Sequence, residues 1–148
     1  MKTARILAFF LIGGGLLGIL NSGLVGFHLG AFIGAVLFSW SIVTGVVLWR
    51  RMPAGFVWAK ILFALQILVL SVGRLVYEFS TFFSFRLMIG DTSHYIGGNI
   101  GSSCNIRLFP HSVGFLVGIN IVAVVALFCV MRISRAASAE IPAGAQVA

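Results

Sequence analysis

Two opposite charges stand one helical turn apart in an apolar stretch, and they are the first residues that could do chemistry. Arg74 and Glu78 are four residues apart, the spacing at which side chains meet on one face of a helix. At about 100° per residue, Lys60 and Ser71 fall in the same narrow sector, whereas Gln66 lies outside it. The pattern therefore predicts a helix with one polar face.

The Arg74–Glu78 pair has two interpretations. A lone charge inside a membrane costs at least about 2.5–3.5 kcal/mol, so the two side chains are expected to pair. In the structural interpretation, this pair fixes the helix against its neighbours or reaches the outer headgroups. In the functional one, it forms a small-molecule or lipid-binding site together with Ser71: Arg74 binds an anionic headgroup or carboxylate, and Glu78 tunes the site or exchanges a proton. A proton-coupled pump is disfavoured because Arg74 already offsets that acid.

All three histidines are expected on the outer side of the membrane. His28, His94 and His111, with Cys104, are a possible ligand set for copper, zinc or haem. No two of them share a tight metal-ligand spacing, and the alternative is that each histidine hydrogen-bonds the backbone or headgroups at the interface. Metal or haem binding is thus a third functional hypothesis, and we expect no cofactor.

Cysteine and nucleophile chemistry is sparse. Cys104 and Cys129 are expected near opposite membrane faces, so they cannot pair within one chain, although Cys104 could link two copies. A thiol–disulfide exchange enzyme needs a closely spaced cysteine pair, which this sequence lacks. No nucleophile has an evident base beside it, so we do not expect an enzyme.

The elements that hold these residues are set by the thickness of a bilayer. No charged side chain occurs between Arg5 and Arg50. Since about 20 helical residues cross a hydrocarbon core of about 30 Å, that stretch predicts two spans. The predicted fold is an all-α membrane protein, a four-transmembrane-helix bundle with a glycine-rich first hairpin. The expected spans are residues 6–20, 26–49, 56–79 and 113–131, with one long outer loop at 86–112 between helices three and four. The membrane domain covers 1–135, and 136–148 is expected to be a disordered cytoplasmic tail.

Glycines at four-residue spacing predict close helix packing, because helices in lipid associate through small residues. These glycines are Gly14 and Gly18 in the first span, Gly26, Gly30 and Gly34 in the second, and Gly114 and Gly118 in the fourth. They pack the bundle internally in one interpretation. In the other, the ridge of the second span faces another copy or a partner subunit.

Composition and charge place the chain in a membrane. Hydrophobic residues make up 60% and charged residues 9% of the sequence, and the mean hydropathy is +1.13. A soluble domain of 148 residues could not bury so much apolar surface. The formal charge of +7 does not indicate nucleic-acid binding, because most basic residues flank the apolar spans. One side is expected to hold Lys2, Arg5, Arg50, Arg51, Lys60, Arg132 and Arg135, and the other only Arg86 and Arg107. This asymmetry predicts cytoplasmic N- and C-termini, and the layout is typical of small proteins of the bacterial inner membrane.

We therefore expect a small integral membrane accessory or scaffolding protein. Its expected partners are the lipid bilayer and either further copies of itself or a larger membrane complex. The alternative is small-molecule or lipid binding or transport, centred on Arg74 and Glu78.

Overall fold

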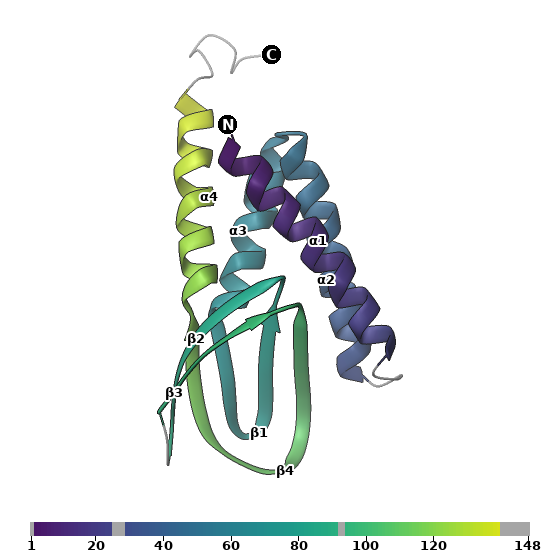
Figure 1. Ribbon diagram of the computed structural model, residues 1–148, viewed down its shortest axis with the longest axis vertical. Helices are drawn as coiled ribbons and strands as arrows, with labels where there is room; N and C mark the ends of the chain where they lie inside the picture. The colour runs from purple at the N-terminus through teal and green to yellow at the C-terminus, as the bar shows by residue number, and fades with distance from the viewer. Residues whose placement is uncertain (1, 25–28, 92–93, 140–148) are drawn as a thin grey trace.

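The fold combines four helices with one antiparallel sheet. The computed structural model describes residues 2–24, 29–91 and 94–139, without the side chains of residues 108–113 and 138–139. The helices are α1 (Lys2–Leu24), α2 (Leu29–Trp49), α3 (Pro53–Ile67) and α4 (Ile121–Ala139). The strands are β1 (Leu68–Ser80), β2 (Phe83–Gly90), β3 (His94–Ile100) and β4 (Ser103–Asn120). The sheet lies at one end of the molecule and α3 and α4 at the other, while the hairpin of α1 and α2 extends from the helical end down alongside the sheet (Figure 1).

The expected all-α bundle of four transmembrane helices is wrong. α3 ends at Ile67, and residues 68–79, which were expected to complete the third span, lie in β1. Residues 113–120 of the expected fourth span lie in β4, so that α4 begins only at Ile121. The expected outer loop, residues 86–112, contains all of β3 and parts of β2 and β4.

Side-chain shape accounts for the difference. β1 has the sequence LVLSVGRLVYEFS, in which β-branched and aromatic residues recur, and such residues favour a pleated, half-buried strand. Low charge density is common to membrane helices and buried strands, so it does not separate the two. Pairing with β4 along most of the length of β1 decides the outcome in favour of the strand.

α1 and α2 form a hairpin and are long and apolar enough to cross a membrane. A Cβ added at Gly15 would lie 2.7 Å from the carbonyl oxygen of Phe38, and one added at Gly18 would overlap the Phe38 ring. On α2, a Cβ at Gly45 would lie 2.9 Å from the carbonyl oxygen of Ala8. The two helices thus approach so closely because both lack side chains at their contact points.

The outer surface of this hairpin is apolar. Large apolar side chains that are more than half exposed are Ile6, Phe9, Leu16, Leu20 and Leu24 on α1 and Leu29, Phe32 and Val36 on α2. Exposed apolar surface of this extent is typical of a protein that lies in lipid or against a partner.

The sheet has the strand order β1-β4-β2-β3, and every pair is antiparallel. The β1–β4 register shifts on both sides of Gly73, which has φ +57°, as at a bulge that bends a ribbon. Beyond the bend, β1 and β4 run back toward the helices, as Figure 1 shows. The returning ribbon packs on α2, where Cys104 lies against Gly34 and the rings of Phe79 and Phe38 are 5.5 Å apart.

Amide side chains secure both joints between the sheet and the helices that continue it. At the start of α4, the Asn120 Oδ1 atom accepts hydrogen bonds from the backbone nitrogens of Val122 and Phe85, each at 3.2 Å. The first bond caps the helix, and the second ties it to β2. At the end of α3, Gln66 makes the corresponding contact to the turn between β1 and β2.

Most of the buried core lies where α1, α2, α3 and α4 meet. Its members are Ala8, Leu11, Phe38, Leu48, Phe56, Ala59, Leu62, Phe63, Phe79 and Val130. Phe79 is the member that comes from the sheet, so the returning ribbon is joined to the helical core.

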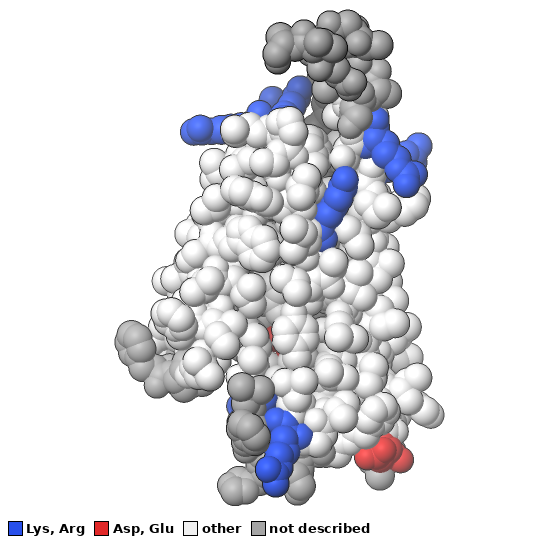
Figure 2. Space-filling model, turned by 180° about the vertical axis from the view of Figure 1, so that it is seen from behind, with Lys and Arg blue, Asp and Glu red and all other residues white. Residues whose placement is uncertain are grey.

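Charged residues concentrate at the two ends of the molecule. α1 begins and α4 ends at the same end (Figure 1). On the face that Figure 2 shows, Lys and Arg gather at and near that end, few charged atoms are visible over the middle of the molecule, and further charges lie at the far end of the sheet. This distribution resembles that of a protein with an apolar belt between two polar faces.

Candidate ligand pocket between the helices and the sheet

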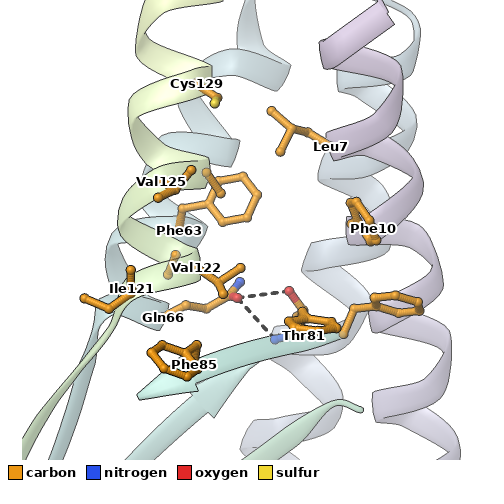
Figure 3. Close-up of a pocket in the computed structure, with 14 residues that line it drawn as sticks. Leu7, Phe10, Phe63, Gln66, Thr81, Phe85, Ile121, Val122, Val125 and Cys129 are labelled. Carbon is orange, nitrogen blue, oxygen red and sulfur yellow. Dashed lines mark hydrogen bonds between the residues drawn. The ribbon is translucent and has the colours of Figure 1, made fainter. Parts of the chain in front are cut away.

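A cavity lies between α1, α3 and α4, next to the turn that joins β1 to β2. Its volume is about 480 Å³, which falls within the range of ligand pockets, about 300–1,000 Å³. It is lined by Leu7, Phe10, Phe63, Gln66, Thr81, Phe82, Phe83, Phe85, Ile121, Val122, Ala123, Val125, Ala126 and Cys129. Figure 3 shows these side chains around the open space between α4 and α1.

The walls of this pocket are apolar. α4 contributes residues at helical spacing, with Ile121, Val125 and Cys129 following one another at four-residue intervals. α1 contributes Leu7 and Phe10 from the opposite side (Figure 3). No lining residue carries a charge, so the walls suit an apolar ligand.

The floor is polar and is formed by Gln66 and Thr81. The Gln66 Oε1 atom accepts hydrogen bonds from the backbone nitrogen of Thr81 at 3.1 Å and from Thr81 Oγ1 at 3.0 Å. Because the backbone nitrogen can only donate, the oxygen of the Gln66 amide must face Thr81. This contact assigns the two ends of the amide group.

The other end of that amide is left free. Gln66 is 2% exposed, and its Nε2 atom has no hydrogen-bond partner among the residues that the structure describes. In Figure 3 this nitrogen is turned away from Thr81. A buried donor without a partner costs about 1–3 kcal/mol, so this atom is the one feature of the pocket that calls for a polar partner.

The floor is held at the middle of α1 by a chain of contacts. The backbone nitrogen of Phe82 donates to Ser102 Oγ at 3.1 Å, and Ser102 Oγ donates in turn to the carbonyl oxygen of Gly14. A Cβ at Gly14 would lie 2.9 Å from the Phe82 nitrogen, and the Phe82 ring lies 5.1 Å from that of Phe10. Phe82 adopts φ +65°, a conformation that bulky residues rarely take. The contacts of Phe82 with Ser102, Gly14 and Phe10 hold the turn in this unfavourable conformation.

The predicted polar helix face does not form, because Ser71, Arg74 and Glu78 lie on β1 whereas Lys60 lies on α3. Arg74 is exposed on β1, and Ser71 is half-buried on the other side of the Gly73 bend. Glu78 pairs with Arg86 of β2 instead of Arg74, at 2.7 Å between Oε1 and the Arg86 nitrogen.

The Glu78–Arg86 pair belongs to a compact hydroxyl network. Ser103 Oγ donates to Glu78 Oε1 at 2.8 Å, and Arg86 donates to Ser103 and Ser80 at 3.2 and 3.3 Å. The side chains of Glu78 and Arg86 are 22% and 13% exposed. The network ties the returning β1–β4 ribbon to β2 and does not face the pocket.

The structure describes only part of the expected set of metal ligands. His94 is exposed at the start of β3, His28 lies outside the described residues, and the side chain of His111 is not described. No group of three or more potential metal ligands occurs among the described residues.

The two cysteines are free and lie on different elements, β4 and α4. Cys129 lines the pocket on α4, while Cys104 lies on β4 against α2. Burial, reinforced by the charge of Glu78, raises the pKa of the Cys104 thiol to about 11. Burial, with a contribution from Cys104, raises the pKa of Tyr77 to about 12, and its hydroxyl donates to the carbonyl oxygen of Leu65 at 2.7 Å.

The expected packing glycines have several different contacts. Gly18 meets α2, Gly14 meets the β1–β2 turn, and Gly34 meets β4. Gly30 is buried on α2, whereas Gly26 lies outside the described residues. Gly114 and Gly118 lie on β4 rather than on a helix, and a Cβ at Gly118 would lie 2.9 Å from the carbonyl oxygen of Leu87 on β2.

Sequence reasoning missed the pocket and its floor. The available signal was Gln66 itself, an isolated amide in the apolar run between Lys60 and Arg74 and off the expected polar sector. An intramembrane polar residue is a candidate functional site whether or not it shares a face with others.

No protein-family model matches this chain, and searches of curated proteins and of solved structures also find no match.

Proposed function

We propose that this chain is an integral membrane protein that binds a lipid-like ligand in the pocket between α1 and α4. The observation that carries the proposal is a ligand-sized cavity with uncharged, apolar walls and one buried polar group without a partner. Pockets with mostly apolar walls and a few placed polar groups are the usual form of a small-molecule site.

The depth of the pocket supports a ligand drawn from the bilayer. Gly14, which contacts the pocket floor, is about 14 Å along α1 from Arg5. Gln66 is about 20 Å along α3 from Pro53, which follows the basic pair Arg50-Arg51. With the basic end of the molecule at one membrane face, the pocket falls within a hydrocarbon layer of about 30 Å. A ligand would then enter sideways between α1 and α4.

The same placement orients the protein. The basic end, where α1 begins and α4 ends, faces the cytoplasm, and the sheet lies toward the outer side. An inner membrane of bacterial type is the proposed location. Non-helical backbone at membrane depth is tolerated only where other parts of the protein shield it from lipid. The β1–β2 turn meets this condition because it packs on Gly14 of α1.

The experiment compares two bulky substitutions on α4. Ala126 lines the pocket, and Ala126→Phe would occupy part of its volume while leaving Gln66 and Thr81 unchanged in sequence. Val124 is 40% exposed and does not line the pocket, so Val124→Phe is the matched control. Each protein is purified from membranes in mild detergent, and bound lipid-like molecules are extracted and quantified by mass spectrometry.

We expect a near-stoichiometric lipid-like molecule with the wild-type chain and with Val124→Phe, and its loss with folded Ala126→Phe. Equal recovery from Ala126→Phe and Val124→Phe would contradict the proposed function, because it would place the bound molecules on the general surface.

An accessory or scaffolding role is the second candidate, and the edge of the sheet favours it. β3 is an end strand of the sheet, and its apolar residues Tyr95, Ile96 and Ile100 are 53%, 69% and 76% exposed. Such an edge is a template for pairing with another strand, here that of a second copy. Substitution of Asn99 by Pro should then abolish dimers seen by chemical crosslinking in membranes, whereas persistent dimers would rule out this edge as the contact.

A further inference from the structure

We propose that the ligand is a long-chain molecule with an uncharged oxygen acceptor, such as a carbonyl, and that this oxygen accepts a hydrogen bond from Gln66 Nε2. The inference rests on the proposed function and specifies the class of molecule that the pocket takes.

The orientation of the Gln66 amide leaves a hydrogen-bond donor, and not an acceptor, available to a ligand. Its Oε1 atom is occupied by both donors of Thr81, so the amide cannot turn over without losing these two contacts. Nε2 can only donate, and no described residue accepts from it. The group that completes the site must therefore be an acceptor.

The acceptor must also be uncharged. No lining residue carries a positive charge, and the guanidinium of Arg86 is already engaged by Glu78, Ser80 and Ser103. An anion at this depth would lose its hydration without gaining a counter-charge. A carboxylate or phosphate is therefore disfavoured relative to a neutral ester, ketone or quinone oxygen.

A long apolar chain follows from the shape of the walls. From Gln66 the lining continues past Phe63 on α3 and, on α4, from Ile121 to Cys129, a rise of about 12 Å. Leu7 lies on the opposite side. An extended chain with its oxygen at the floor would contact both walls. Lipid acyl esters and isoprenoid quinones both have this chemistry.

The test uses two fluorescent probes that differ in one group. One is the methyl ester of a conjugated polyene fatty acid, and the other is the polyene hydrocarbon of the same length. Binding to the purified full-length protein in detergent is followed by probe fluorescence. With the wild-type chain we expect the ester to bind about tenfold more tightly, the gain from satisfying one buried donor.

Two variants assign this preference to Nε2. Gln66→Met keeps the length of the side chain but lacks the amide, so it should bind both probes equally. Thr81→Val removes the Oγ1 contact but keeps the backbone contact to Gln66, so the preference for the ester should persist. A Gln66→Met protein that still prefers the ester would overturn the inference.

Infrared spectroscopy of the wild-type complex detects the hydrogen bond to the ester carbonyl directly. This measurement needs no variant, so it does not depend on whether the variants fold. A ¹³C-labelled ester carbonyl should absorb at lower frequency when it is bound than in empty micelles. An unshifted carbonyl band, or equal binding of the two probes by the wild-type protein, would contradict the inference. Either result would still be compatible with a pocket that binds apolar ligands. Failure of both probes to bind would instead contradict the proposed function.

Extraction of the protein from its native membrane separates the two sources of such an oxygen. An uncharged acyl ester, such as a diacylglycerol, or a quinone recovered in stoichiometric amount, and absent from Ala126→Phe, identifies the source and supports the inference. Recovery of free fatty acids alone, or of hydrocarbons alone, would contradict it.

Discussion

At the scale of single residues, the placement of charges decides which side chains pair. Glu78 and Arg74 are neighbours in sequence, but on a strand two residues four apart are separated by about 13 Å. Arg86, on a different strand, is brought to 2.7 Å from Glu78, and both side chains bond the Ser103 hydroxyl. The ion pair is therefore a property of the fold rather than of the local spacing.

Removing one partner of this pair should be costly, and removing both should not. Glu78→Leu leaves Arg86 charged and mostly buried, so we expect a loss of about 3 kcal/mol in the free energy of unfolding. The double variant Glu78→Leu with Arg86→Met should stay within about 1 kcal/mol of wild type. Denaturant unfolding in detergent micelles measures both.

Arg74→Leu is the control for this pair. Arg74 is exposed and forms no ion pair among the described residues, so its loss should change stability by no more than about 0.5 kcal/mol. A larger loss for Arg74→Leu than for Glu78→Leu would contradict the observed pairing.

The thiol of Cys104 should react slowly with alkylating reagents. Its pKa of about 11 lies above the ordinary 9.0, so at pH 8 the reactive thiolate is about a hundredfold rarer than in the unfolded chain. In a Cys129→Ser background, iodoacetamide labelling should be slow in the folded protein and fast after denaturation. Labelling at equal rates in both states would refute this.

The same raised pKa has a consequence for stability. The folded state holds the Cys104 proton more tightly, so this contribution is complete below pH 9 and is lost as pH rises from 9 to 11. We expect Cys104→Ser to lessen the fall in melting temperature over that interval. An unchanged pH profile would mean that other groups dominate it.

At the scale of elements, close helix packing depends on which glycine faces the partner. Gly15→Ala places a methyl group against the carbonyl oxygen of Phe38 and should lower stability by about 1–3 kcal/mol. Gly13 is the matched control, since a Cβ there would meet only the Phe82 ring, at 3.9 Å. Gly13→Ala should be neutral or stabilising. Comparable losses for both, measured as thermal unfolding in detergent, would contradict this packing.

The elements also show how far the sequence could be interpreted. The hairpin of α1 and α2 was foreseeable, because an uninterrupted apolar stretch of that length has few other solutions. The switch from α3 to β1 at Leu68 was not, because the helix and the strand are about equally compatible with the local sequence. Long-range pairing, such as Leu68 with Ile119, makes the choice.

At the scale of the whole molecule, both ends of the described chain lie at the basic end (Figure 1). If that end faces the cytoplasm, a fluorescent reporter fused to either terminus should be active, and a periplasmic phosphatase fused to either terminus should be inactive. Termini that report from different compartments would refute the proposed orientation.

The sequence by itself determined that the first two helices are long, apolar and rich in glycine and that basic residues flank the apolar stretches, because hydrophobic length, composition and charge are local properties. Only the tertiary structure decided that Glu78 meets Arg86, and that Gln66 is buried with its oxygen occupied and its nitrogen free. These features depend on the turn at Thr81 returning to the middle of α1, which requires strand pairing over long separations. Loop closure and sheet register are properties of the whole chain, so no local pattern contains them.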